Sequence, residues 1–364
     1  MAETPRATTV VVVDDSAVQR RFVRAAIEAD PDFTVVGEAR NGKEAVALVA
    51  RLRPGAVLMD LDLPHMSGIE AIERIMASSP TPILVYSGHV GGAESDNALE
   101  ALAAGAVDVL SKPGPEDRGT LEDYADQLRR RLRVAARVRV ITHPRGRLRS
   151  KGIPVAGSLS LTSRRQEREP MEARLGVKLL AIGASTGGPQ ALHTVLKDLP
   201  ADLDQAVVVV QHMAEGFIPG LAAWLDQLVP LPVVVGGSGR RLLPRTITIA
   251  PSGGNLLVQD DRLRVLCTDP DPGQFHVPGI DQCFRSVADA LGPDAIGVLL
   301  TGMGRDGAAG LKAMRDRGAV TLGQDEATST VYGMPAAALA MDAVEHQLPV
   351  DQIGGALLGL VGRA

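Results

Sequence analysis

Short runs of valine, leucine, isoleucine and alanine recur along the chain, and several of them end directly in a polar residue. Thr9 to Val13 is followed by Asp14, and Val207 to Val210 is followed by Gln211 and His212. Such short apolar runs, alternating with segments of helical spacing, are typical of parallel strands buried between helices. The pattern therefore restricts the fold to the α/β class, with polar side chains gathered where strands end.

The alternation occurs twice, which suits a chain of 364 residues that is too long for one core. The first series predicts strands at 9–13, 34–39, 56–59, 82–87 and 106–110, and helices at 17–29, 43–51, 68–77, 92–104 and 121–139. The second predicts strands near 177–182, 206–211, 232–235, 246–250, 262–267, 295–300 and 318–321, and helices near 188–198, 217–228, 280–291, 307–316 and 333–341. We therefore expect two doubly wound parallel-sheet domains, the first flavodoxin-like and the second Rossmann-like.

A stretch of different composition separates the two series. Ten basic residues and no acidic one lie between Arg129 and Lys151, and Pro144, Gly146 and Gly152 interrupt regular structure. We interpret residues 126–176 as a solvated linker between domains at 8–125 and 177–364. A contact of the basic run with anionic lipid or an acidic partner stays open.

The overall composition excludes several classes of protein. The net charge of -5 argues against a nucleic-acid binder. Cys267 and Cys283 are too few for a disulfide framework and lack metal-ligand spacing, so we expect thiols in a reducing compartment. No signal peptide or membrane-spanning stretch is evident, so we expect a cytoplasmic protein that is not inserted in a membrane.

Polar residues at strand ends of the first domain predict a phosphoacceptor site. Asp14 and Asp15 follow the first strand, Asp60 the third, Ser87 ends the fourth, and Lys112 follows the fifth. Carboxylates crowded at one edge repel one another unless a divalent cation neutralises them, which predicts an oxygen-ligand Mg²⁺ site at Asp14, Asp15 and Asp60. Asp60 would then attack a phosphoryl donor, Lys112 would balance the charge of the transferred oxygens, and Ser87 would bind the new phosphoryl group.

This set of residues resembles the receiver domain of bacterial response regulators. Singly, each residue has an ordinary interpretation, such as a helix N-cap for Asp14 or Asp15. Their order and their positions at strand ends carry the resemblance. One departure is Val109, where receivers usually have an aromatic residue that moves with the switch hydroxyl.

In the second domain, Gly183-Ala184-Ser185-Thr186-Gly187 follows a strand and matches the turn that exposes a nucleophilic serine. A match this short has two other interpretations, a tight turn with Ser185 as a helix cap and a phosphate-binding loop. The phosphate loop is disfavoured because no Gly-Lys-Ser/Thr sequence follows.

A base and an orienting carboxylate for Ser185 are available at neighbouring strand ends. His212 ends the run 207–211, and Asp306 lies in a glycine-dense loop after 295–300. We expect a Ser185–His212–Asp306 triad, whose chain order differs from that of α/β-hydrolases and which requires no metal. His276, in a loop, is a candidate for substrate contact, whereas we expect His193 and His346 to be structural or solvated.

Taken together, the receiver, the linker and the motifs Gly-Ala-Ser-Thr-Gly-Gly, Gln-His-Met, Ala-Pro-Ser-Gly and Thr-Gly-Met-Gly-Arg-Asp-Gly resemble the CheB family of chemotaxis methylesterases. The resemblance implies hydrolysis of glutamyl methyl esters on methyl-accepting chemoreceptors, and deamidation of receptor glutamines. It implies that Thr186 and Met303 line the active site, with the Met303 backbone N–H at the oxyanion. It also implies that the unphosphorylated receiver covers the site until a chemotaxis histidine kinase phosphorylates it.

The chain departs from the family pattern around the substrate groove, at Ala214, Gly236 to Gly239, Asn255, Val277 and Gly279. These departures leave the receptor substrate open. They keep open an esterase of a non-chemotactic sensory array. The other alternative is a catalytically silent, phosphorylation-controlled docking module, against which the retention of Ser185, His212 and Asp306 argues.

Overall fold

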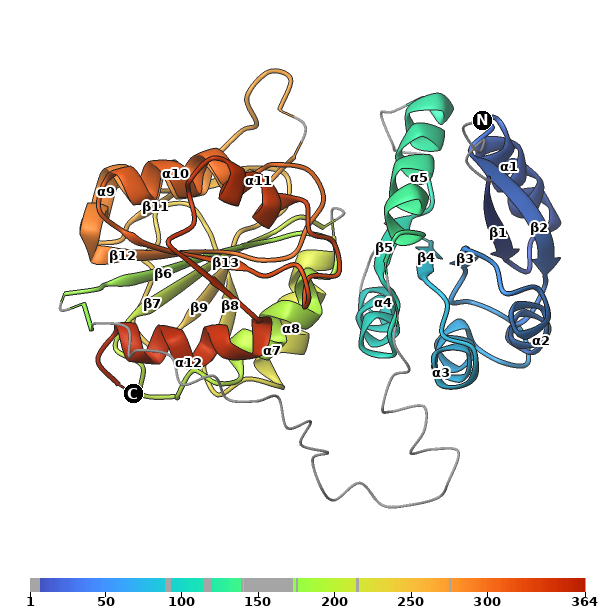
Figure 1. The fold of residues 1–364 in the computed structure, drawn as a ribbon, viewed down its shortest axis with the longest axis horizontal. Helices are drawn as coiled ribbons and strands as arrows, with labels where there is room; N and C mark the ends of the chain where they lie inside the picture. Colours follow the sequence, from blue (N-terminus) through green and yellow to red (C-terminus); the bar gives the residue numbers. More distant parts are fainter. Residues whose placement is uncertain are drawn as a thin grey trace, which may run out of the picture.

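A computed structural model describes residues 7–88, 93–113, 120–138, 140, 173–174, 176–213, 216–274 and 276–363. The chain forms two α/β units that lie side by side (Figure 1). Each unit is a parallel sheet with helices on both faces, so the expected fold class is confirmed. A separate two-stranded antiparallel hairpin is added to the C-terminal unit.

The N-terminal unit alternates strands and helices in strict order. Its elements are β1 (Thr8–Val13), α1 (Ala17–Glu28), β2 (Phe33–Ala39), α2 (Gly42–Leu52), β3 (Ala56–Met59), α3 (Gly68–Ser78), β4 (Ile83–Ser87), α4 (Ala93–Ala103), β5 (Asp108–Ser111) and α5 (Leu121–Ala135). The strand order is β2-β1-β3-β4-β5. Successive residues of β1 face opposite sides, so Val10 and Val12 pack in the cluster of α1 and α5, while Val11 and Val13 pack with α2 and α3.

The C-terminal unit has a seven-stranded sheet in the order β14-β13-β12-β6-β7-β9-β8. Its elements are β6 (Leu179–Ala184), α7 (Gly188–Leu196), β7 (Ala206–Gln211), α8 (Phe217–Asp226), β8 (Val233–Val235), β9 (Ile247–Ile249), β10 (Asn255–Val258), β11 (Val265–Thr268), α9 (Ile280–Leu291), β12 (Ala295–Leu299), α10 (Ala308–Asp316), β13 (Val320–Gln324), α11 (Met334–Ala340), β14 (His346–Leu348) and α12 (Val350–Leu360). Helices α7, α8 and α12 cover one face, and α9, α10 and α11 cover the other (Figure 1). The chain reverses direction across the sheet between β6 and β12, and ligands bind at such switch points in open α/β sheets.

The turns from strand to helix differ between the two units. In the N-terminal unit α1, α2, α3 and α5 begin after a side-chain cap, at Ser16, Asn41, Ser67 and Thr120 respectively. In the C-terminal unit α7, α8 and α10 begin after glycines with φ of 76°, 88° and 88°, at Gly187, Gly216 and Gly307. Glycine adopts this left-handed conformation without steric cost, so the chain turns sharply at the strand ends.

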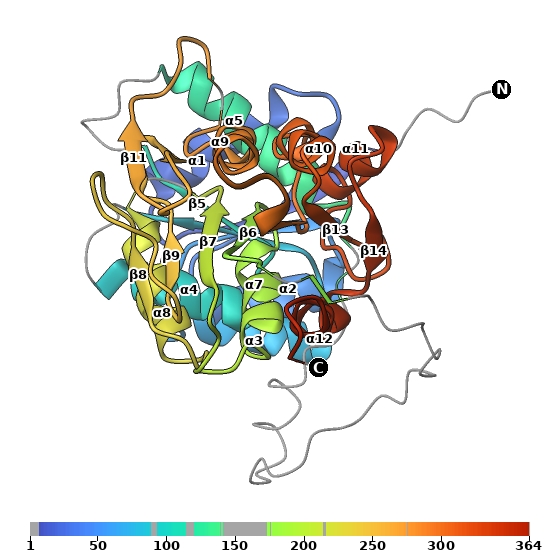
Figure 2. The same ribbon diagram turned by 90° about the vertical axis from the view of Figure 1, so that its left-hand side faces the viewer.

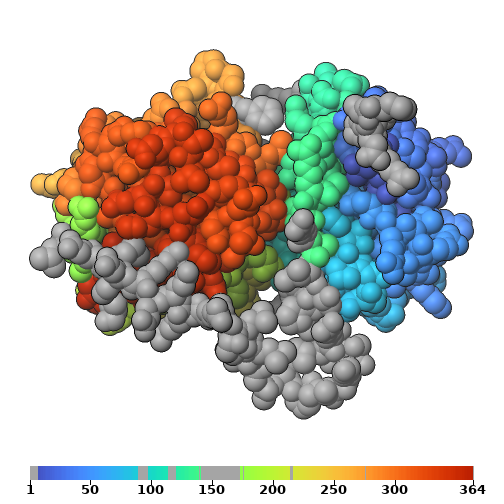
Figure 3. Space-filling model, in the orientation of Figure 1, coloured from blue at the N-terminus to red at the C-terminus, as the bar shows by residue number. Residues whose placement is uncertain are grey.

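The two units share an apolar contact surface. Helix α4 packs against α7 and α8, and the Gln190 side chain donates to the Leu102 carbonyl at 2.6 Å. Val331, from the C-terminal unit, packs against the core cluster of α1 and α5. In Figure 3 the blue-green surface of α5 lies against the orange and red surface of the C-terminal unit.

Four elements differ from the sequence predictions, the first being β10, since no strand is expected near 255–258. The strand expected near 262–267 is β11, which pairs with β10 outside the main sheet (Figure 2). The sequence predicts no strand or helix after 341, but the chain there forms β14 and α12. Strand β14 is only three residues long, and α12 contains three glycines, so neither has a strong periodic signal.

Helix α5 runs past residue 125, where we placed the boundary of the first domain, and ends at Ala135. Leu128 and Leu132 are fully buried, so this part of the predicted linker packs on the N-terminal unit. Most of the remaining linker and its basic run, as well as Ala214, lie outside the described residues. Among the described helices, none combines the length and the apolar character that a bilayer crossing requires.

We predict that Leu128→Ala lowers the free energy of unfolding of the N-terminal unit by about 3 kcal/mol, because it leaves a cavity in the core. Thermal unfolding of the full chain, followed by circular dichroism, measures this change. The matched control is Leu121→Ala in the same helix. Leu121 is 65% exposed, so this substitution should cost less than about 0.5 kcal/mol. Equal losses would contradict the packing of α5.

Candidate active site

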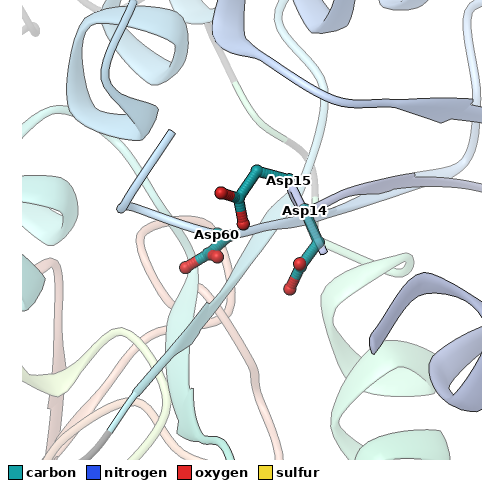
Figure 4. A group of neighbouring side chains, drawn as sticks. All are labelled: Asp14, Asp15 and Asp60. Carbon is teal, nitrogen blue, oxygen red and sulfur yellow. The ribbon is translucent and has the colours of Figure 1, made fainter. Parts of the chain in front are cut away.

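The N-terminal unit gathers three carboxylates at the carboxyl ends of β1 and β3. Asp14 and Asp15 follow β1, and Asp60 follows β3, which pairs with β1. Each residue has an oxygen within 4.8 Å of the others (Figure 4). All donors are hard carboxylate oxygens, which is the set that Mg²⁺ prefers, so these residues fit the cation that the sequence predicts.

Lys112 is the counterion of this cluster. Its Nζ lies 2.6 Å from Asp60 Oδ2 and 2.8 Å from Asp14 Oδ2. Burial opposes the charge of the ammonium group, but the two carboxylates outweigh it and raise the pKa of Lys112. Lys112 therefore stays charged at neutral pH.

The carboxyl group of Asp60 is buried, which disfavours its ionised form. It is 2% exposed, and burial raises its pKa from 3.8 to about 6, although Lys112 acts in the other direction. The nearby Asp14 carboxylate adds to the rise. Any cation bound at Asp60 would relieve this cost.

Ser87 is buried at the end of β4, and its carbonyl accepts from Lys112 N at 2.6 Å. Tyr86, which the sequence pattern does not single out, directly precedes Ser87. The Tyr86 ring lies 5.2 Å from Lys112 Nζ and 6.2 Å from the Tyr124 ring of α5. An aromatic side chain thus connects the acidic cluster to α5 even though Val109 carries none.

In the C-terminal unit, Ser185 directly follows β6, at the turn into α7. It is 8% exposed. Its backbone N–H donates to the Thr301 carbonyl at 3.0 Å, and its own carbonyl accepts from Gly188 N at 2.7 Å. The Thr301 hydroxyl donates to the Thr186 carbonyl at 3.0 Å. The loop that carries Ser185 and Thr186 is therefore held by the loop after β12.

His212 and Asp306 lie in direct contact. His212 follows β7, the neighbour of β6, and its Nε2 is 2.8 Å from Asp306 Oδ2. The carboxylate of Asp306 also accepts from the backbone N–H groups of Ile280 at 2.8 Å, and of Asp281 and Gly307 at 3.0 Å each. Burial alone would raise the pKa of Asp306, but the His212 ring and these N–H groups hold it below its usual value.

Because Asp306 is ionised, the proton of the neutral His212 ring resides on Nε2 and the lone pair on Nδ1. Nδ1 is buried and has no hydrogen-bond partner among the described residues. Within the same residues, no hydrogen bond joins Ser185 Oγ to the ring. Two members of the predicted triad are thus bonded, while the nucleophile lies at the adjoining strand end without that bond.

Met303 lies in the loop between β12 and Asp306. Its side chain is 39% exposed, and no described residue accepts a hydrogen bond from its backbone N–H. Gly302 brings this loop against the nucleophile, since a Cβ at Gly302 would be 2.6 Å from Ser185 Cβ. The Met303 N–H is therefore available near Ser185.

His276 stacks on the ring of His212, with centroids 4.4 Å apart and planes 6° from parallel. Burial first, and then the proximity of His212, lower the pKa of His276 to about 4, so its ring is neutral at neutral pH. The other two histidines of the C-terminal unit lie away from this pair. His193 packs edge-on against Trp224, and His346 lies in β14.

Two sequence departures near the site are joined in one network. The Asn255 side chain accepts from Gly279 N at 2.8 Å and exchanges two hydrogen bonds with the amide of Gln274. A Cβ at residue 279 would be 2.7 Å from Gln274 Nε2, so a larger residue there would require the Gln274 amide to shift.

The N-terminal unit reaches the rim of this site through β5 and α5. Asp108 Oδ2 accepts from the Thr186 hydroxyl at 3.3 Å and pairs with Arg131 at 2.6 Å. The Arg131 charge is also among those that lower the pKa of His276. Side chains of the receiver-like unit therefore lie at the residue next to Ser185.

Comparison with known proteins identifies both units. Residues 180–357 match the CheB methylesterase family model, and residues 10–122 match the response regulator receiver domain. A protein-glutamate methylesterase/protein-glutamine glutaminase of Paramagnetospirillum magneticum is 40% identical over 97% of this chain and 96% of its own. One from Anaeromyxobacter dehalogenans is 42% identical over 97% and 96%. The solved catalytic domain of Thermotoga maritima CheB is 31% identical, covers 50% of this chain and 97% of its own, and has a TM-score of 0.49.

We predict that the raised pKa of Asp60 makes the N-terminal unit less stable as pH rises. The contribution of the protonated carboxyl is complete below about pH 3.8 and is lost as pH rises through about 6. Without added metal, Asp60→Asn should therefore raise the free energy of unfolding at pH 7.5 by about 1–2 kcal/mol, with little effect at pH 4. Thermal unfolding at several pH values measures this difference, with the exposed Asp62→Asn as control. A gain independent of pH would exclude titration of Asp60 as its cause.

Proposed function

Because this chain belongs to the CheB methylesterase family, we propose that it hydrolyses glutamyl methyl esters on chemoreceptors with Ser185 as nucleophile, His212 as base and Asp306 as orienting carboxylate. The observation that carries the proposal is the 2.8 Å contact between His212 and an ionised Asp306 at the strand end beside Ser185. It leaves one ring nitrogen unprotonated, as a general base requires.

The reaction follows from these positions. His212 Nδ1 takes the proton of Ser185 Oγ as the oxygen attacks the ester carbonyl. The protonated ring then returns the proton to the methoxy oxygen, and methanol leaves an acyl-enzyme. A water molecule, deprotonated by His212, releases the glutamate. With a glutamine side chain the leaving group is ammonia, which gives the second activity named for the relatives.

The oxyanion of the tetrahedral intermediate needs hydrogen-bond donors. We propose the Met303 N–H for this role, because it has no acceptor among the described residues and its loop touches Ser185. Thr186, whose hydroxyl binds Asp108, would line the site once that contact opens. The neutral His276 ring would keep His212 in its plane and exclude water from it.

We propose that Asp60 is the phosphoacceptor and that Asp14, Asp15 and Asp60 hold Mg²⁺. When bound, the cation would neutralise the charge of the incoming phosphoryl group. Lys112 would shift from the carboxylate of Asp60 to the phosphoryl oxygens, and the hydroxyl of Ser87 would bind the same group. The phosphodonor would be a chemotaxis histidine kinase in the cytoplasm, and no nucleic acid is involved.

Phosphorylation would act on the active site through β5 and α5. Strand β5 runs from Asp108, at the rim of the active site, to Ser111, beside Lys112, a span of about 10 Å. The rings of Tyr86 and Tyr124 form a second connection between Lys112 and α5. A change at Asp60 can therefore weaken the contact between Asp108 and Thr186 and uncover Ser185.

We predict that Ser185→Ala and His212→Ala each reduce methanol release from radiomethylated receptors by several orders of magnitude. The double variant should be little worse than either single variant, because both residues serve one proton transfer. Circular dichroism checks the fold, and His346→Ala, in the distant β14, is the control that should retain activity. Full activity of Ser185→Ala would reject the triad, whereas a wild type that releases no methanol would favour the docking module.

We also predict that Asp108→Ala raises the activity of the unphosphorylated chain by about fivefold, because the loss of one interdomain hydrogen bond is worth about 1 kcal/mol. Asp126→Ala, which removes a partner of Arg129 within the N-terminal unit, is the matched control and should leave this activity unchanged. Asp60→Ala should stay at the low level with or without a phosphodonor and Mg²⁺. No gain in Asp108→Ala would show that this contact does not restrain the enzyme.

A further inference from the structure

Gln211 is the last residue of β7 and is 1% exposed. Its side-chain Nε2 donates two hydrogen bonds of 2.8 Å, one to the carbonyl oxygen of Ser185 and one to that of His212. A single amide group thus joins the backbones of the proposed nucleophile and base. Both of its N–H groups are used in this bridge.

Other bonds fix each residue, but to different parts of the molecule. Ser185 N donates to Thr301 across the sheet, and His212 N donates to Ala184. The Gln211 amide, in contrast, bonds to Ser185 and His212 alike. These two bonds therefore fix the distance between the turn after β6, which carries Ser185, and the turn after β7, which carries His212.

The amide cannot be reversed, because its oxygen would then face two carbonyl oxygens. In the observed orientation Oε1 is buried without a hydrogen-bond partner among the described residues. An unsatisfied buried acceptor costs about 1–3 kcal/mol. The unsatisfied oxygen belongs to the same amide whose nitrogen bonds to the Ser185 and His212 loops.

The neighbouring backbone is shaped around this amide. A Cβ at Gly188 would lie 2.0 Å from Gln211 Oε1, so the first residue of α7 must be glycine if the amide is to fit. Gly188 N donates to the same Ser185 carbonyl that Gln211 binds, at 2.7 Å. That carbonyl thus has both of its lone pairs occupied.

We propose that Gln211 is a positioning residue of the esterase reaction, whose amide sets the separation of Ser185 and His212 for proton transfer. This inference rests on the proposed function. Gln211 does not touch the reacting atoms. A misplacement of the base by about 1 Å costs about 100-fold in rate, whereas substrate binding does not depend on it.

The test is Gln211→Glu in the full chain, assayed on radiomethylated receptors after phosphorylation with acetyl phosphate and Mg²⁺. An ionised carboxylate repels both carbonyls, whereas the protonated form has the shape of the amide and donates one hydrogen bond. We expect kcat to fall about 100-fold at pH 8, with KM within about twofold. The ratio of variant to wild-type kcat should recover as pH falls and the introduced carboxyl is protonated.

Gln211→Met keeps the length of the side chain without a charge, so it tests the bridge if the glutamate variant does not fold. It should lose kcat similarly, but without recovery at low pH. The matched control is Gln205→Glu, at the opposite end of β7. Gln205 is also buried, donates to the Val177 carbonyl at 3.2 Å and has an unpaired Oε1. It should lose stability but retain kcat.

A fluorophosphonate probe that reacts with activated serines separates this proposal from the proposed function. If the wild type labels at Ser185 but does not cleave receptor esters, slower labelling of Gln211→Glu with recovery at low pH supports the positioning role alone. Wild-type kcat in both Gln211 variants, or a loss equal to that of Gln205→Glu and independent of pH, would overturn the proposal. So would the absence of both labelling and hydrolysis in the wild type.

Discussion

The site depends on one buried carboxylate. The carboxylate of Asp306 accepts hydrogen bonds from the backbone N–H groups of Ile280 and Asp281 at the start of α9. It also accepts one from Gly307 before α10, so it lies at the amino ends of two helices. Unpaired N–H groups and helix dipoles both favour a negative charge there. The ionised form then fixes the tautomer of His212. The Asp306 carboxylate thus bonds to the amino ends of two helices and to the end of β7, and these bonds fix their positions relative to the loop after β12.

Much of this arrangement could be predicted from the order of the residues, because carboxyl ends of parallel strands meet at one edge. Ser185, His212 and Asp306 follow strands that pair as neighbours, and Asp14 and Asp60 do the same in the other unit. The side-chain contacts among residues at this edge of the sheet could not be predicted. The stacking of His276 on His212 and the bridge of Gln211 depend on side-chain directions, which sequence spacing does not contain.

The missed elements have local causes. Helix α12 contains Gly354 and Gly355, which weaken its helical signal. Gly354 is required by packing, since a Cβ there would be 2.8 Å from the Val195 carbonyl of α7. Packing against α7 therefore selects a residue of low helix propensity at this position of α12. The placement of β11 outside the main sheet likewise depends on its pairing with β10, whose run of four residues gives little signal alone.

The network of Asn255, Gln274 and Gly279 shows that the departures near the substrate groove are not independent. A Cβ at position 279 would lie 2.7 Å from the amide nitrogen of Gln274, and the backbone N–H of Gly279 already donates to Asn255. An exchange at position 279 would therefore shift the Gln274 side chain and, through it, Asn255, so the effects of single exchanges within this network would not be additive. The shape of the rim is thus a joint property of these three residues, and an exchange at any one of them changes the surroundings of the other two.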